Sequence, residues 1–378
     1  MKNPIERFGR SNPLTLLPVL VLALLCAVPP CALGQEGELP HGGLTREDFV
    51  RAKGFVGGDK DNNGELGDAA TLSERYDVLR YGLDLQVDPS DRSIAGAVTM
   101  VFASTYEGLT EMIFDLRQTL AIETVGHMSG VLAFTHEGDS VTVQLPAPLA
   151  EGAVDSVVVQ YGGIPTPPLV NRGLMFREVR REHGGSTEDL FPLVANLSQP
   201  GYAQSWWPCK DRPDDKFVMT MTLTVPEILT AVSNGTFQGE APAAPGWRTY
   251  RWAEAYPIAT YLVSVAISEY VLLSEECATP GGSDIPLRNW VWQKDVENAL
   301  IEFENLCPMM GFCEDRFGPY PFQGEKYGHA EFLWNGAMEH QTVTSIGHGS
   351  FSPPGTHQWL VMHELAHQWF GDSLTPAT

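Results

Sequence analysis

The chain of 378 residues is acidic and has the composition of a folded globular protein. Hydrophobic residues make up 43% and charged residues 19% of the sequence, a balance that excludes an intrinsically disordered chain. Acidic residues outnumber basic ones by 47 to 24, so the surface would repel a phosphate backbone and nucleic-acid binding is not expected.

Residues 1–34 are typical of a secretory signal peptide. Basic residues come first, an apolar run occupies positions 14–28, and small residues precede a cut at Gln35. We therefore expect removal of residues 1–34 and export to the periplasm or the extracellular space. An uncleaved membrane anchor is the alternative, but the run is short for a span of about 20 residues and contains Pro18. The protein would contact a membrane only in that case.

Residues 35–75 are predicted to be a linker, because they are rich in Gly, Asp and Glu and show no sustained apolar period. Within them, Asp59-Lys60-Asp61-Asn62-Asn63-Gly64 is similar to the start of an EF-hand calcium loop. The twelfth position of that loop is Ala70 instead of a bidentate Glu. A solvated turn is the preferred interpretation, with a calcium site as the alternative.

Residues 76–272 show the period-two alternation of half-buried strands. Tyr81, Leu83 and Leu85 alternate with more polar neighbours, and the same pattern recurs over residues 217–225. Asn234-Gly235 is a strong hairpin-turn signal between two strand candidates. We predict one all-β, antiparallel, saddle-like N-terminal domain of many short strands.

Residues 273–378 have a different pattern. A further strand is expected over 287–293, and apolar spacing predicts one helix over 296–312 and another over 355–370. Thr356 is the predicted N-cap of the second helix, and Gly371 is its predicted C-cap. Strands followed by helices predict an α+β catalytic domain, so the fold class expected is multidomain.

Four cysteines remain after the predicted signal peptide: Cys209, Cys277, Cys307 and Cys313. An exported protein can oxidise them, and Cys307 with Cys313 could close a small loop. The spacing fits no zinc ribbon, so structural or free-thiol roles are expected, and the sequence does not determine the connectivity.

The strongest chemical signal is His363-Glu364-Leu365-Ala366-His367. Histidines four residues apart lie on one face of a helix, so both imidazoles can reach one metal ion. Neutral imidazole is a good zinc ligand, and Glu364 is placed to accept a proton from a water beside the metal. The surrounding helix is apolar, and burial of these polar groups without a metal would be costly. We therefore predict Zn²⁺ as the cofactor.

The sequence around this motif resembles the M1 (gluzincin) aminopeptidases. Gly336-Ala337-Met338-Glu339-His340 resembles the family's GxMEN exopeptidase motif, 24 positions before the zinc helix. Two further landmarks are similar to family segments, namely residues 206–211 and 317–322. The four landmarks occur in the family's order and cover about residues 76–378, so the resemblance implies a thermolysin-like catalytic domain over 273–378.

The resemblance also implies roles for matched residues. Glu339 would bind the free α-amine of a peptide substrate, and a carboxylate near the metal favours such a cation. Gly336, Ala337 and Met338 would line the path of the substrate backbone. Gln199 falls where the family has a pocket Gln or Glu, although a polar loop residue is the alternative. His340 stands where the family usually has Asn, which concerns details of the first substrate pocket.

The family's third zinc ligand is a Glu about eighteen residues beyond the second His, a position that lies past Thr378. We expect a zinc aminopeptidase acting on peptides, with one zinc in the complete enzyme, and an inactive chain as it stands. A zinc endopeptidase is one alternative, and Glu339 argues against it. A non-catalytic peptide-binding β-domain with a remnant zinc helix is the other.

Overall fold

The computed structural model describes residues 72–279, 282 and 284–376. The predicted signal peptide, most of the predicted linker and the calcium-like turn at 59–64 lie outside these residues. Within them, no helix is both long enough and apolar enough to cross a membrane.

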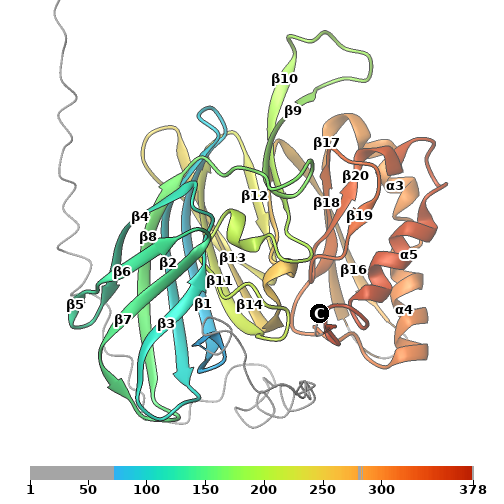
Figure 1. The fold of residues 1–378 in the computed structure, drawn as a ribbon. Coiled ribbons are helices and arrows are strands. Elements are labelled where there is room, and N and C mark those ends of the chain that lie inside the picture. Colours follow the sequence, from blue (N-terminus) through green and yellow to red (C-terminus); the bar gives the residue numbers. More distant parts are fainter. Residues whose placement is uncertain (1–71, 280–281, 283, 377–378) are drawn as a thin grey trace, which may run out of the picture. The chain divides into compact units, whose positions relative to one another are not determined.

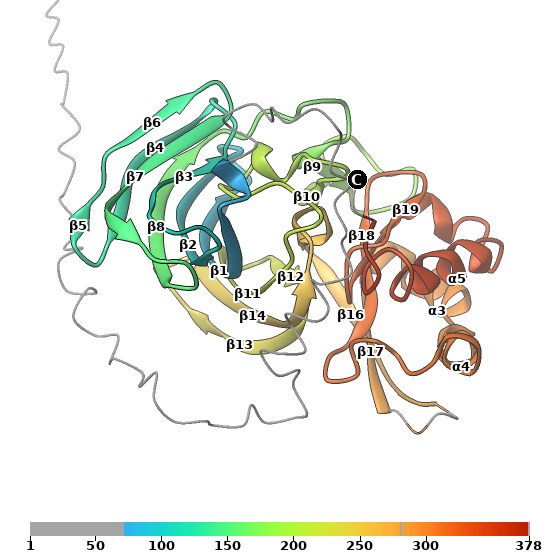
Figure 2. The same ribbon diagram turned by 60° about the horizontal axis from the view of Figure 1, so that its bottom comes forward.

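The largest sheet has eight strands in the order β13-β14-β11-β1-β2-β8-β4-β5 (Figures 1 and 2). Alternate residues of β1 are buried, as their period-two pattern predicts. The expectation of a wholly antiparallel arrangement is wrong at one pair, because β1 and β11 are parallel. More than a hundred residues separate these strands, so the chain has the length that a parallel crossover needs. The strands are β1 (Tyr76–Asp88), β2 (Ser93–Ser104), β4 (Leu120–His127), β5 (Gly130–Val131), β8 (Val154–Gly163), β11 (Phe217–Pro226), β13 (Thr236–Pro242) and β14 (Trp247–Ile258).

Two smaller sheets complete the N-terminal region, in the orders β3-β7-β6 and β12-β15-β10-β9. The predicted hairpin at Asn234-Gly235 is wrong, since β12 pairs with β15 while β13 pairs with β14. The Asn234 side chain instead makes hydrogen bonds with three backbone groups, those of residues 262, 264 and 341. These bonds hold the point at which the chain passes from the sheet of β12 to the sheet of β13. The strands are β3 (Leu109–Asp115), β6 (Phe134–Glu137), β7 (Ser140–Leu149), β9 (Gly173–Arg180), β10 (Leu190–Leu197), β12 (Thr230–Ser233) and β15 (Val265–Ser268).

A five-stranded sheet follows, in the order β16-β17-β18-β20-β19. The strand expected over 287–293 is present as β17 (Asp284–Trp292). β16 begins at Tyr270 and pairs with β17 over its whole length. All six residues of β18 are buried, as expected for a strand with parallel neighbours on both sides. The other strands are β16 (Tyr270–Ala278), β18 (Tyr327–Phe332), β19 (Ala337–Met338) and β20 (Thr344–Gly347).

Helices α3 (Val296–Glu302), α4 (Leu306–Phe317) and α5 (Gln358–His367) lie together on one side of this sheet (Figures 1 and 2). The single helix predicted over 296–312 is wrong. Pro308 has no backbone N–H for the carbonyl of Glu304, and its ring would clash with that carbonyl, so the helix stops and restarts.

Both predicted caps of the last helix are wrong. Its N-cap residue is His357, and the Thr356 hydroxyl donates to the Pro353 carbonyl instead. The Glu302 carboxylate accepts hydrogen bonds from the backbone N–H groups of Gly355 and His357. A side chain from α3 therefore caps the start of the helix in place of a neighbouring residue. The helix ends at His367, before the predicted Gly371.

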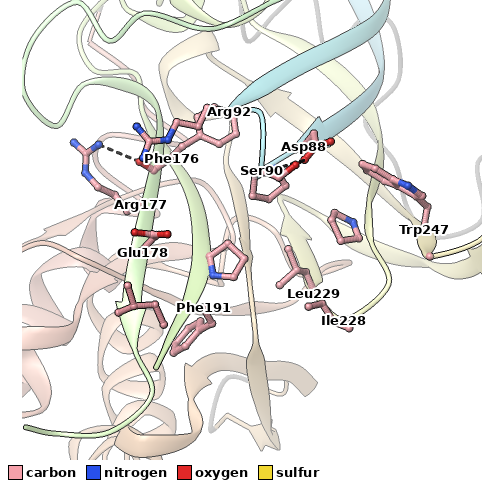
Figure 3. Close-up of a pocket in the computed structure, with 15 residues that line it drawn as sticks. Asp88, Ser90, Arg92, Phe176, Arg177, Glu178, Phe191, Ile228, Leu229 and Trp247 are labelled. Carbon is pink, nitrogen blue, oxygen red and sulfur yellow. Dashed lines mark hydrogen bonds between the residues drawn. The ribbon is translucent and has the colours of Figure 1, made fainter. Parts of the chain in front are cut away.

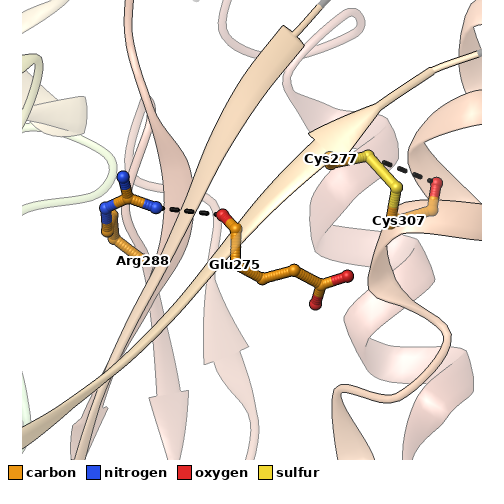
Figure 4. Close-up of a disulfide and its surroundings, with 4 residues drawn as sticks. All are labelled: Glu275, Cys277, Arg288 and Cys307. Atoms are coloured by element: carbon orange, nitrogen blue, oxygen red, sulfur yellow. Dashed lines mark hydrogen bonds between the residues drawn. A yellow bond between two sulfur atoms is a disulfide. The ribbon is translucent and has the colours of Figure 1, made fainter.

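The disulfide joins Cys277 of β16 to Cys307 in the first turn of α4 (Figure 4). The loop considered between Cys307 and Cys313 is therefore wrong. These two residues lie on one helix, and six residues of helix separate their Cα atoms by about 9 Å, which is too far for a disulfide. Cys209 and Cys313 are buried free thiols.

Candidate metal and substrate site

Helix α5 places the two motif histidines side by side. The opposite face of the helix, with Val361 and Leu365, is buried in the core of the second region, which we define as the described residues from β16 onward. His363 is exposed and His367 is half-buried, and their Nε2 atoms lie 3.1 Å apart. Two nitrogens bound to one tetrahedral zinc at about 2.0–2.1 Å would lie about 3.3 Å apart. The pair therefore fits a shared zinc ion.

A backbone carbonyl sets the orientation of one ligand. The Phe370 carbonyl lies 2.9 Å from Nδ1 of His367, so Nδ1–H donates to it and Nε2 keeps its lone pair. Metal-binding histidines normally have such a partner on the second nitrogen. His367 thus has the tautomer that a metal ligand at Nε2 requires.

Glu364 is nearly inaccessible and lies beside a second carboxylate. Burial, together with the charge of Glu339, raises the pKa of Glu364 to about 8. Oxygens of Glu339 and Glu364 and a nitrogen of His367 all lie within 4.8 Å of one another. Within the described part of the chain, Oε2 of Glu364 has no hydrogen-bond partner. This arrangement suits proton transfer or cation binding.

The motif Gly336-Ala337-Met338-Glu339-His340 lies at one edge of the five-stranded sheet. Ala337 and Met338 form β19, which pairs antiparallel with β20. Gly336 has φ of 119°, a conformation that favours glycine, and a Cβ there would meet no atom within 4 Å. The Met338 side chain packs into the core of the N-terminal region. Because Met338 is held in this core, the next residue, Glu339, is held beside Glu364 and His367. The Glu339 residue has 9% of its surface exposed.

His340 turns away from solvent. Its Nδ1 lies 2.9 Å from the Ser345 hydroxyl, and burial lowers its pKa to about 3. A neutral imidazole therefore occupies the position where the family usually has Asn.

Gln199 comes from the N-terminal region and reaches the same site. It follows β10, and its Nε2 donates to Oε1 of Glu339 at 3.4 Å. The structure thus brings together Gln199, Glu339, Glu364, His363 and His367, whereas Met338 packs into the core. Their roles in binding or catalysis stay predictions.

Sequence reasoning missed a buried polar chain behind the motif. Oε1 of Gln368 accepts the backbone N–H of Thr342 at 2.8 Å, and its Nε2 donates to Oδ2 of Asp372 at 2.7 Å. Gln368 therefore ties the zinc helix to the segment just after Glu339. Burial, with Glu339 nearby, raises the pKa of Asp372 well above its usual value. The sequence offered one signal for this chain of hydrogen bonds, because Gln368 is a polar residue directly after His367 in an otherwise apolar segment.

A hollow of about 460 Å³ lies elsewhere, against the β1–β2 turn and strands β9 and β10 (Figure 3). Its walls include Phe176, Phe191 and Trp247, with Asp88 and Arg92 at the turn. It shares no lining residue with the motif site. We base the functional proposal on the motif site because the predicted metal ligands and the predicted general base converge there.

Comparison with known proteins places the fold and the family. The profile described as the Peptidase M1 N-terminal domain matches residues 73–262. Leukotriene A-4 hydrolase of Xenopus laevis is 23% identical over 321 residues, which are 81% of this chain and 49% of that protein. Aminopeptidase N of Haemonchus contortus is 28% identical over 205 residues, which are 50% of this chain and 20% of that protein.

A solved M1 zinc metallopeptidase from Deinococcus radiodurans has the same fold, with a TM-score of 0.65 and 24% identity over 80% of this chain and 66% of that one. A two-domain M1 zinc metallopeptidase variant bound to L-tryptophan superposes with a TM-score of 0.67 and 25% identity, over 80% of this chain and 66% of that one. The chain spans about half the length of the leukotriene A-4 hydrolase and a fifth of the aminopeptidase N. By the domain that it carries, the chain belongs to the M1 peptidase family.

Proposed function

We propose that this chain is part of a zinc aminopeptidase that removes N-terminal residues from peptides. The observation that carries the proposal is the convergence of Glu339, from the exopeptidase motif, with Glu364 and His367 of the zinc helix. The names of relatives support it, since they include aminopeptidases and zinc metallopeptidases.

His363 and His367 would hold the zinc ion, one per enzyme. When bound, zinc would polarise the scissile carbonyl and the attacking water. Glu364 would take the proton of that water at Oε2, the oxygen that lacks a partner among the described residues. A carboxylate with a raised pKa is better matched to proton transfer near neutral pH than an ordinary one.

Glu339 would bind the substrate's α-ammonium group, with Gln199 orienting one of its oxygens. Gly336 leaves open space beside the chain, which suits an approaching peptide backbone. A carboxylate that anchors a free amine beside the metal disfavours internal cleavage, so an endopeptidase is not our choice. A complete His-Glu-His set disfavours a purely binding role.

We also propose that this chain, taken alone, binds zinc weakly and is inactive. Two histidines supply two ligands, whereas catalytic zinc normally has three protein ligands and a water. Elemental analysis after dialysis checks this. Near-stoichiometric zinc with steady turnover would show that a described carboxylate, Glu339 or Glu364, completes the ligand set.

The aminopeptidase proposal is tested by comparing free and N-acetylated forms of one peptide, with the enzyme extended to the length of its relatives. We expect the free peptide to be cleaved and the acetylated peptide to resist. Glu339→Gln should weaken binding of the free peptide, whereas Glu178→Gln, at an exposed site on β9, should not. Equal cleavage of both peptides would refute the role of Glu339.

Export remains a proposal that rests on residues 1–34 and on the Cys277–Cys307 disulfide, which needs an oxidising compartment. Amino-terminal sequencing of the mature protein should begin at Gln35. A mature protein that retains residues 14–28 would favour the membrane-anchor alternative.

A further inference from the structure

The short segment after the zinc helix packs directly on a predicted metal ligand. The Phe370 carbonyl accepts from Nδ1 of His367, and the backbone N–H of Asp372 donates to the His367 carbonyl at 3.0 Å. A Cβ on Gly371 would lie 3.0 Å from that same Nδ1. The position of residues 370–373 therefore determines how the His367 ring is held.

The N-terminal region holds this segment from the other side. Nζ of Lys216 donates to the carbonyls of Asp372 at 2.5 Å and of Ser373 at 3.0 Å. The Tyr261 hydroxyl donates to the Gly371 carbonyl at 3.1 Å. Three consecutive carbonyls after the helix thus accept hydrogen bonds from two side chains of the β-sheet region. These carbonyls lie after the helix, which ends at His367, and the Asp372 carbonyl also accepts from the Thr375 hydroxyl at 2.7 Å.

We propose that Lys216 and Tyr261 are positioning residues for the metal ligand His367. By holding residues 371–373 they fix the Phe370 carbonyl, which in turn fixes the ring orientation and tautomer of His367. The inference rests on the proposed role of His367 as a metal ligand. It assigns the N-terminal region a part in building the metal site, in addition to the contact of Gln199 with Glu339.

The contact of Lys216 is more than an incidental surface contact. Burial of the Lys216 amine lowers its pKa to about 8, although the nearby Asp372 opposes this effect. Placing a cation in a poorly solvated position costs free energy, and the two carbonyls compensate for lost water. An exposed lysine would make such contacts only transiently.

The test uses the full 378-residue chain and Co²⁺, which reports its ligands by visible absorption. We compare Lys216→Met, Lys216→Arg and Tyr261→Phe with Tyr270→Phe. Tyr270 is a matched control because its hydroxyl also donates to a backbone carbonyl, that of Glu331, at 2.7 Å. Loss of an outer partner typically weakens metal binding by about 10–100-fold, so we expect about tenfold for Lys216→Met. We expect a smaller loss, about fivefold, for Tyr261→Phe, and little change for Lys216→Arg or Tyr270→Phe.

A second measurement needs no metal. Nitrogen-15 NMR of labelled histidine reports the tautomer of His367 in the metal-free chain, with His367→Gln identifying its signals. We expect the Nδ1–H form in the unchanged chain and in Tyr270→Phe, and a mixture in Lys216→Met. An unchanged tautomer and Co²⁺ affinity in a Lys216→Met variant that only melts earlier would overturn the proposal. If no form of the chain binds Co²⁺ but the tautomer still shifts, the two histidines do not hold the metal by themselves, as proposed for this chain alone, and the positioning role stands.

Discussion

Strands β11 and β18 both lie inside sheets, but β11 buries only apolar side chains, whereas β18 also buries ionisable ones. The inward positions of β11 are Phe217, Met219, Met221, Leu223 and Val225, each at most 2% exposed. All of β18 is buried, and it carries His329 and Glu331. Burial lowers the pKa of His329 to about 3, and burial with Asp295 nearby raises the pKa of Glu331 well above its usual value.

Two buried polar sets, one from each region, differ in how they are partnered. In the β-sheet region the buried ammonium of Lys210 has a carboxylate partner, Asp215, at 2.6 Å. Within the described residues of β18, Nε2 of His329 and Oε1 of Glu331 have no hydrogen-bond partner. Unpartnered buried groups of this kind cost stability. Among the described residues the N-terminal region also has some, at Trp207 and Glu254, so the contrast holds between these two strands and not between the whole regions.

The largest effect is expected at Glu364. Glu364→Gln keeps the size of the side chain and removes its basicity, so the active enzyme should lose about 10²–10⁴-fold in turnover. The pKa of about 8 implies that the folded metal-free chain binds a proton that the unfolded chain releases above pH 4.5, so stability falls as pH rises from about 4.5 to 8. The variant should show a shallower fall, because the contribution of Glu364 is removed.

Kinetics and urea unfolding at pH 5 and 8 measure both effects. Leu223→Ala is a control for a purely structural effect. It creates a cavity in the β11 core, which should lower the free energy of unfolding by about 2–5 kcal/mol and leave metal affinity unchanged. Near-full turnover in Glu364→Gln would remove the general base from the mechanism.

Acid should affect the second region through His329. Its pKa is about 3 in the folded chain and near 6.5 when unfolded, so the unfolded state takes up a proton that the folded state refuses. Stability should therefore fall as pH drops from 6.5 to 3, by up to about 4–5 kcal/mol. Urea unfolding of His329→Gln should show a shallower fall. The exposed His183, replaced in the same way, is the control, and parallel curves for His329→Gln and the unchanged chain would contradict the assignment.

The disulfide should support the second region selectively. It closes a loop with a sequence separation of 30 residues, which corresponds to about 3–4 kcal/mol of chain entropy in the unfolded state. Replacing Cys277 and Cys307 by Ala should destabilise residues from β16 onward, while the β-sheet region keeps its protection in hydrogen exchange. Cys313→Ala, at a buried free thiol, should have a smaller effect. Uniform loss of protection would show that the two regions unfold as one unit.

The smallest effect is expected at Glu331, and it is stabilising. Glu331→Gln removes a buried acid while its amide oxygen can still accept the Trp292 N–H. At pH 8 the free energy of unfolding should rise, and the gain should shrink toward pH 4.5, where unfolded glutamates are protonated. Chemical unfolding at both pH values measures this. A destabilised variant at pH 8 would indicate that the charge of Glu331 is needed by a neighbour.

Local sequence patterns predicted many of the strands, the helix of the motif and the candidate site residues. Alternation in β1 and β11 predicts strands because side chains of a strand point to opposite faces. The spacing of His363 and His367 predicts a shared ligand position because residues four apart meet on one helix face. These features depend on neighbours along the chain, which a sequence displays directly.

Only the tertiary structure decided which segments meet. The parallel pairing of β1 with β11, the bond from Gln199 to Glu339 and the choice of Cys277 as partner of Cys307 all join distant positions. The cap supplied by Glu302 and the bonds from Lys216 to residues 372 and 373 are of the same kind. Any polar side chain could satisfy a given backbone group, so the sequence leaves the partner open, and burial of the apolar faces selects it.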